Sequence, residues 1–194
     1  MSQIYCPFPE NYELIDAGGG KKLERWGELI TIRPEHQAYF PAGLKPQEWK
    51  ALAHWEFVSD TPASLNGKWK ALKPPAPKSW VFHSGNMHVQ LELTSNKHIG
   101  IFPEQYYNWQ FIAATLQPQQ RFLNLFAYTG VASLVGRTTG AEVTHVDAVR
   151  AMLDWARLNM ETSGLNDIRW VLEDARKFVN RELKRGNRYD LIQM

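Results

Sequence analysis

The chain has 194 residues, of which 44% are hydrophobic and 22% are charged. This composition is ordinary for a globular protein with one substantial core or two small ones. No apolar run approaches the roughly 18–20 residues that a membrane-spanning helix needs. No basic stretch followed by an apolar run marks a signal peptide at the N-terminus. We therefore expect no membrane partner.

The cysteine content, the net charge and the histidine spacing limit the expected location, partners and metal sites of the protein. Cys6 is the only cysteine, so no internal disulfide can form and a reducing, cytoplasmic location is expected. The formal net charge is only +2, which is weak for a protein that grips long nucleic acid by its backbone. The six histidines have no metal-ligand spacing, so no metal site is predicted.

Short strands and turns are expected before residue 103. Residues 12–16 and 23–32 are predicted to form a hairpin around the glycine turn at 18–20, with a break at Gly27. Residues 46–57 are predicted to form one short helix with Trp49, Leu52 and Ala53 on its buried face. Alternating apolar residues at 87–93 predict a half-buried strand, and the proline-rich segment 73–77 predicts a loop. Residues 1–102 thus read as a small β-rich α+β module.

After residue 103 the pattern alternates between helices and strands. Helices are expected over 103–116, 131–137, 148–163 and 175–184, and strands over 122–126, 143–147, 168–172 and 189–194. The third helix has an apolar stripe of Val149, Met152, Leu153, Ala156 and Met160. Such alternation predicts an α/β domain over residues 103–194, with helices on both faces of a parallel, Rossmann-like sheet.

Ligands of such sheets bind beyond the carboxyl ends of the strands. The first strand is followed by Tyr128, Thr129 and Gly130, where helix-start N–H groups can hold a polar group and glycine allows close approach. Asp147 follows the second strand and can accept two hydrogen bonds from a ribose diol. Asp174 follows the third strand, where a carboxylate can accept from the amine of a purine. This arrangement predicts a nucleoside cofactor.

A nicotinamide dinucleotide is disfavoured. Its pyrophosphate requires the G-x-G-x-x-G pattern, because the backbone must turn tightly and approach the phosphates. Only Gly130 is present at that spacing. A nucleotide-dependent oxidoreductase is therefore the weaker alternative.

Residues 124–134 (NLFAYTGVASL) resemble the first motif of S-adenosylmethionine-dependent methyltransferases. The likeness is greatest to the bacterial large-subunit ribosomal RNA cytosine-C5 methyltransferases. Residues 143–147 with 152–159, and residues 173–178, are similar to the second and third motifs of that family. Segment 100–106 resembles a stretch near the cofactor that usually ends in arginine; Tyr106 stands there, so only Gln105 is carried over. Residues 12–16 and 23–27 resemble the module ahead of the catalytic domain.

The resemblance implies S-adenosylmethionine as cofactor, and methyl transfer to RNA as the activity. Gly130 and its neighbours would seat the methionine end, Asp147 the ribose, and Asp174 with Ala175 the adenine. Asp147 as a helix cap, Asn124 as a loop-orienting residue and Tyr128 as a packing aromatic remain alternatives. The implied cofactor-binding residues are Gln105, Asn124, Phe126, Tyr128, Thr129, Gly130, Asp147, Asp174 and Ala175.

In that family the strand corresponding to 189–194 runs into an Asp-Pro-Pro motif and a substrate-binding loop, neither of which this sequence contains. The resemblance implies that the catalytic loop, and the cysteine nucleophile of the cytosine-C5 members, lie beyond Met194. Cys6 is far upstream and is no substitute, so no catalytic residue is assigned. A catalytically incomplete cofactor-binding module is therefore an alternative, and the oligomeric state is left open.

One further stretch bears on an RNA partner. Residues 61–91 contain no acidic side chain, and Lys68, Lys70, Lys73 and Lys78 interleave with Trp69 and Trp80. Basic groups that alternate with aromatic rings suit phosphate contact and base stacking. The alternative is a solvated hairpin with buried tryptophans.

Overall fold

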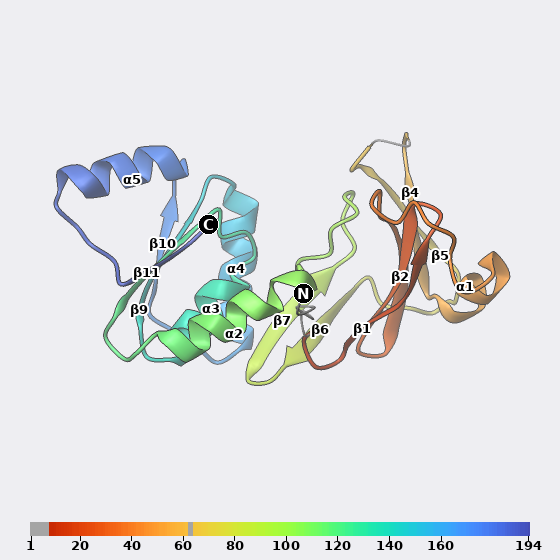
Figure 1. Ribbon diagram of the computed structural model, residues 1–194, viewed down its shortest axis with the longest axis horizontal. Helices are drawn as coiled ribbons and strands as arrows, with labels where there is room; N and C mark the ends of the chain where they lie inside the picture. The colour runs from red at the N-terminus through yellow and green to blue at the C-terminus, as the bar shows by residue number, and fades with distance from the viewer. Residues whose placement is uncertain (1–7, 62–63) are drawn as a thin grey trace, which may run out of the picture. The chain divides into compact units, whose positions relative to one another are not determined.

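The computed structural model describes residues 8–61 and 64–194, so Cys6 lies outside the described part. The described chain forms two compact units (Figure 1). The first comprises Phe8–Ser84 with Leu91–Gly100, and the second comprises Gly85–Gln90 with Ile101–Met194. The units interleave in sequence, and the domain division at residue 103 stays a prediction.

The first unit is built on a five-stranded sheet in the order β1-β2-β3-β4-β5. β3 and β4 are parallel, and the other neighbours are antiparallel. A helix, α1, lies between β3 and β4 in the chain, and β6 and β7 pair as a separate two-stranded sheet. The bounds are β1 Tyr12–Gly18, β2 Lys21–Trp26, β3 Leu29–Pro34, α1 Pro46–Leu52, β4 Trp55–Ser59, β5 Gly67–Ala71, β6 Ser79–Ser84 and β7 Met87–Glu92, of which residues 87–90 belong to the second unit.

The predicted hairpin is confirmed, with Gly18 opposite Lys21 at its end. The break at Gly27 is also confirmed, because Gly27 adopts a φ of 65° in the turn between β2 and β3. The packing around Gly18 also requires glycine, because a Cβ there would lie 2.2 Å from the backbone nitrogen of Ala42. The loop at Ala42 therefore packs directly on this hairpin.

The prediction of one helix over residues 46–57 is wrong in its second half. The helix ends at Leu52, and β4 begins at Trp55. Trp55 and Phe57 are buried while Val58 is 50% exposed, so this segment has the two-residue period of a strand. Leu52, predicted to be buried, is 39% exposed, whereas Trp49 and Ala53 are buried as expected.

A buried ion pair joins β2 to β3 in the interior of the first unit. Glu24 accepts from Arg33 through both oxygens, at 2.7 Å from Nε and 2.8 Å from Nη2. The hydroxyl of Tyr12 donates to the same carboxylate, and Lys22 lies 3.3 Å from it. Burial alone would raise the pKa of Glu24, but Arg33 and these donors lower it below its usual value.

Replacing Glu24 by glutamine is expected to destabilise the protein by about 3 kcal/mol, because it leaves Arg33 buried without a counter-charge. The free energy of unfolding in urea measures this loss. Glu13→Gln is the matched control, since Glu13 pairs with Arg25 at the surface, where ion pairs contribute little. Equal stability of the two variants would contradict the assigned role of the pair.

The second unit contains a parallel four-stranded sheet in the order β10-β9-β8-β11. The predicted α/β fold is confirmed. Its elements are η1 Pro103–Gln105, α2 Tyr106–Thr115, β8 Arg121–Leu125, α3 Val131–Thr138, β9 Glu142–Asp147, α4 Arg150–Thr162, β10 Ile168–Leu172, α5 Ala175–Lys184 and β11 Leu191–Gln193.

Helices cover both faces of this sheet. Figure 1 shows α5 on one side and α2, α3 and α4 on the other. Phe178 of α5 packs with Leu123 of β8 and Val146 of β9. On the opposite face, a Cβ on Gly136 of α3 would lie 2.4 Å from the ring of Phe122, so this glycine lets α3 lie close to the sheet.

Helix α4 begins two residues later than predicted. Val149, predicted to lie on the buried stripe, is 51% exposed and takes an extended conformation just before the helix. The stripe prediction is wrong at this residue because Val149 precedes the helix. Leu153 and Ala156 are buried as predicted, and Asn159 continues the buried face.

Segment 85–90 attaches to α4. The backbone nitrogen of Gln90 donates to Asn159 Oδ1 at 2.8 Å, and its carbonyl accepts from the indole of Trp155 at 2.8 Å. The hydroxyl of Ser163 bonds to both backbone groups of His88 at 3.0 Å. Within residues 8–61 and 64–194, no helix is long and apolar enough to cross a membrane.

Candidate cofactor site

The loop after β8 has an unusual backbone. Phe126 and Tyr128 adopt φ angles of 52° and 53°, and Gly130 follows with 87°. A left-handed conformation costs a residue with a side chain roughly 1–2 kcal/mol, so the surroundings must hold it. The backbone nitrogen of Ala127 donates to the Val146 carbonyl at 3.1 Å, which ties the loop to the end of β9.

Asp147 is the main support of this loop. Its Oδ2 accepts from the backbone nitrogen of Tyr128 at 2.9 Å, and its Oδ1 accepts from that of Val149 at 2.8 Å. Its backbone carbonyl accepts from Glu173 at 3.1 Å. Asp147 thus connects the ends of β8, β9 and β10. Each carboxylate oxygen has a second lone pair, so a ligand hydroxyl can still bind to it.

Gly130 is required by its packing as well as by its φ angle. A Cβ at this position would lie 2.9 Å from the Cβ of Ala156 in α4. The predicted reason for glycine was close approach of a ligand, but the space is filled by protein. The carbonyl of the neighbouring Thr129 accepts from Asn159 Nδ2 at 2.9 Å. Asn159 therefore links the loop to α4, a role that the sequence interpretation missed.

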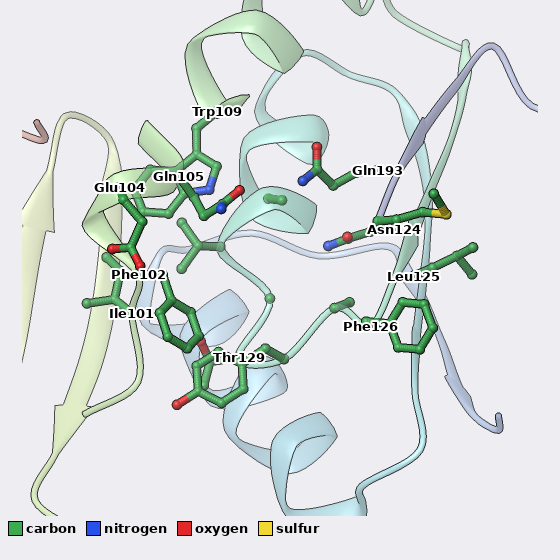
Figure 2. Close-up of a pocket in the computed structure, with 16 residues that line it drawn as sticks. Ile101, Phe102, Glu104, Gln105, Trp109, Asn124, Leu125, Phe126, Thr129 and Gln193 are labelled. Atoms are coloured by element: carbon green, nitrogen blue, oxygen red, sulfur yellow. The ribbon is translucent and has the colours of Figure 1, made fainter. Parts of the chain in front are cut away.

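A pocket of about 350 Å³ lies beside this loop, within the range typical of small-molecule sites. Figure 2 shows Ile101 and Phe102 on one side of it and Asn124, Leu125 and Phe126 on the other. The structure brings six of the nine predicted cofactor-binding residues together in its lining: Gln105, Asn124, Phe126, Tyr128, Thr129 and Gly130.

The other three predicted residues lie outside the lining. Asp147 holds the loop through its bond to the Tyr128 nitrogen but does not line the pocket. Asp174 is exposed and accepts from the backbone nitrogen of Lys177 at 3.0 Å, which makes it the N-cap of α5. Ala175 is 7% exposed and packs in the core beneath α5. The contacts of Asp147, Asp174 and Ala175 with a cofactor stay predictions.

Several residues that the sequence interpretation did not select also line the pocket. Phe102 packs against Tyr128, with ring centroids 5.2 Å apart, and Trp109 lies one helical turn after Gln105. Gln193 is at the carboxyl end of β11, so the strand-end rule alone could have identified it. The further lining residues are Ile101, Glu104, Leu125, Ala127, Val131, Ala132 and Met194.

A buried polar chain fixes the amide of Asn124. Its Nδ2 donates to the Ser133 hydroxyl at 2.9 Å, and that hydroxyl lies 3.0 Å from Nδ1 of His145. Burial, and to a lesser degree the positive charge of Arg157, lowers the pKa of His145 to about 3. His145 is therefore neutral at neutral pH. The amide of Asn124 is thus bonded to α3 and not to the loop, and its contact with a cofactor stays a prediction.

The depressed pKa of His145 makes stability depend on pH. Between about pH 3 and 6.5 the unfolded chain holds a proton on this residue that the folded chain does not, so stability falls as pH falls through that window. The slope from one such group is at most about 1.4 kcal/mol per pH unit. His145→Asn keeps a polar atom for Ser133. This variant is expected to lose the contribution of one proton to the slope, which is up to about 1.4 kcal/mol per pH unit.

Urea unfolding at pH 5 and pH 7 measures this slope. Burial lowers the pKa of His98 to about 4, so His98 also contributes to the pH dependence of stability. Its contribution is the same in the parent chain and in the His145→Asn variant. The control is His36→Asn, because His36 is exposed. If His145→Asn retained the pH dependence of the parent chain, the conclusion that His145 is neutral in the folded protein would be refuted.

Comparisons with known proteins identify relatives of this chain in sequence and in structure. No family model matches the chain. A crystal structure of a SAM-dependent methyltransferase from Agrobacterium tumefaciens is 39% identical, with a TM-score of 0.88 over 95% of this chain and 59% of that one. Ribosomal RNA large subunit methyltransferase I of Photobacterium profundum is 29% identical over 186 residues, 94% of this chain and 44% of the relative.

A third relative is ribosomal RNA large subunit methyltransferase K of Neisseria meningitidis, 38% identical over 78 residues, 39% of this chain and 22% of the relative. By fold and sequence, the chain is a relative of S-adenosylmethionine-dependent methyltransferases. Within that class it is related to the ribosomal RNA large subunit methyltransferases K/L and I. The chain spans less than two thirds of the length of each of these proteins.

Proposed function

We propose that the second unit binds S-adenosylmethionine and serves methyl transfer. The observation that carries this proposal is the loop of residues 126–130, which Asp147 holds in alternating left-handed conformations beside a pocket of about 350 Å³. The same segment carries the resemblance to the first methyltransferase motif. The high fold similarity to the Agrobacterium methyltransferase supports the proposal.

Residues at the loop suit the methionine end and the ribose of such a cofactor, and the family resemblance supplies the assignment of the adenine. The first N–H groups of α3 have no partner within the helix and favour a carboxylate, and Val131 and Ala132 line the pocket there. The unused lone pairs of Asp147 suit a ribose diol. We assign the adenine to Asp174 and Ala175 and place Tyr128 at the wall of the pocket.

The cofactor supplies an electrophilic methyl group on a sulfonium. This chain's residues bind that molecule and hold its orientation, and positioning of this kind supplies a large part of the acceleration in bimolecular transfer. Gln105 and Asn124 present amides at the pocket, where Gln105 is held by Asn108 through a 2.7 Å hydrogen bond. We assign no residue to activation of the acceptor.

Calorimetric titration with S-adenosylmethionine is expected to give saturable binding by the parent chain. Asp147→Ala is expected to weaken that binding by at least tenfold, about 1.4 kcal/mol, because it frees the loop and removes the ribose acceptor. The matched control is Asp154→Ala, an exposed carboxylate on α4, which is expected to bind like the parent. Thermal unfolding confirms that each variant is folded.

NAD is the control ligand in the same titration. Gly130 is the only glycine in this turn, whereas a pyrophosphate-binding turn needs three, so no binding of NAD is expected. Tighter binding of NAD than of S-adenosylmethionine would overturn the assignment. Undiminished binding of S-adenosylmethionine by a folded Asp147→Ala variant would refute the role of this carboxylate.

We further propose that the acceptor is RNA, and in particular a cytosine C5 position of large-subunit ribosomal RNA. The named activities of the Photobacterium and Neisseria relatives support a ribosomal RNA acceptor, and the family resemblance of residues 124–134 supports the cytosine C5 position. A ribosomal substrate agrees with a cytoplasmic location. In this proposal residues 103–194 hold the cofactor and residues 1–102 help to hold the RNA.

The lysines considered for RNA contact differ in their surroundings. Lys68 and Lys70 are exposed on β5, and Lys78 is exposed in the loop before β6. Lys73 donates to the carbonyl of Leu52 at 3.0 Å. Trp69 points to the opposite face of β5 and packs on Phe57, with ring centroids 5.2 Å apart. Stacking of bases on Trp69 beside these lysines is therefore not supported, whereas phosphate contact by the lysines is.

A further inference from the structure

The first unit has a pocket of its own, of about 430 Å³, between α1 and the five-stranded sheet. Its apolar surface includes Ile32 of β3, Trp49 of α1 and Leu44 of the loop that precedes α1. Its charged residues are Lys21, Lys50 and Glu56. A concave apolar surface with a few charged groups at its rim is the usual form of a small-molecule or single-residue site.

The wall formed by this loop and helix is held in place by Asp16. The carboxylate of Asp16 accepts from the backbone nitrogens of Gly43 at 3.1 Å and Leu44 at 2.8 Å. It also accepts from the indole nitrogen of Trp49 at 2.8 Å. These three bonds fix the loop and the indole ring that line the pocket, so the pocket needs little rearrangement to bind a ligand.

Positive charge gathers on the same side of the sheet. Ile32 and Glu56, which both line the pocket, face each other across β3 and β4, and Lys70 is the partner of Glu56 on β5. Cross-strand partners share a face, and so do residues two apart, so Lys68 and Lys70 stand on the pocket's side. Glu56 is bound by Lys21 at 2.7 Å. Lys50, Lys68 and Lys70 are exposed around this neutralised pair.

We propose that this pocket binds one nucleotide of a single-stranded RNA, with the base in the apolar pocket and the phosphates at Lys50 and Lys70. The inference rests on the proposed RNA substrate and gives it a binding site. An apolar hollow suits a flat base, whereas lysines outside it suit the charged backbone on either side. A partner that lacked either the anionic chain or the ring would leave half of this surface unused.

Binding of a fluorescently labelled, unstructured ten-nucleotide RNA to the full chain, followed by anisotropy at several salt concentrations, tests the charges. Lys50→Ala and Lys70→Ala are each expected to weaken binding about three- to tenfold. Each is also expected to lower the slope of log affinity against log salt by about 0.7, the value for one phosphate contact on a single strand. Lys184→Ala on α5, an exposed lysine of the second unit, is the matched control and is expected to bind like the parent.

The resonance of the Trp49 indole N–H tests the pocket itself. RNA is expected to shift this resonance, while a heparin fragment of similar charge, which has no bases, is expected to leave it in place. An unmoved Trp49 signal at saturating RNA, or an equal shift with heparin, would overturn the proposal in favour of a general anion-binding face. Unchanged affinity of both lysine variants would overturn it as well.

The failure of this proposal is distinguishable from failure of the proposed cofactor site. Titration with S-adenosylmethionine reports on the second unit and needs no RNA. Intact cofactor binding without the expected RNA effects would overturn the nucleotide pocket alone. Loss of cofactor binding with the RNA effects intact would overturn the cofactor assignment alone.

Discussion

The carboxylate of Asp147 is the interaction on which the second unit's site depends. It binds the backbone nitrogen of Tyr128 with one oxygen and that of Val149 with the other. The first bond holds a loop whose conformation is unfavourable for residues with side chains, and the second positions the start of α4. A side chain that shapes the pocket in the absence of a ligand reduces the ordering that binding would otherwise require.

Buried polar side chains extend this support away from the pocket. Asn159 binds the Thr129 carbonyl on one side and the Gln90 nitrogen on the other, so the loop, α4 and segment 85–90 form one hydrogen-bonded assembly. Ser133 and a neutral His145 hold Asn124 from behind. These bonds fix the side chains that shape this wall of the pocket, although Nε2 of His145 is buried without a hydrogen-bond partner.

Much of this arrangement could be predicted from the sequence, because apolar residues recur with a different period in strands and in helices. Alternating and helical patterns located most strands and helices, and the strand-end rule placed Tyr128, Thr129 and Gly130 at the pocket, whereas Asn124 came from the family resemblance. The helix predicted through Phe57 failed because residues 53–57 suit either structure, and only pairing with β3 and β5 decides between them. The capping alternative for Asp147 anticipated its bond to the Val149 nitrogen, but its bond to Tyr128 and the contacts of Asn159 could not be predicted, since no pattern of residue types records which main-chain group a side chain will meet.

The most direct test of this account is a crystal structure of the chain with S-adenosylhomocysteine. We predict electron density for the ligand in the pocket beside residues 126–130, with its ribose within hydrogen-bonding distance of Asp147 and the left-handed loop retained. Ligand bound elsewhere, or a loop that abandons its bonds to Asp147 when the ligand binds, would contradict the claim that Asp147 builds the cofactor site.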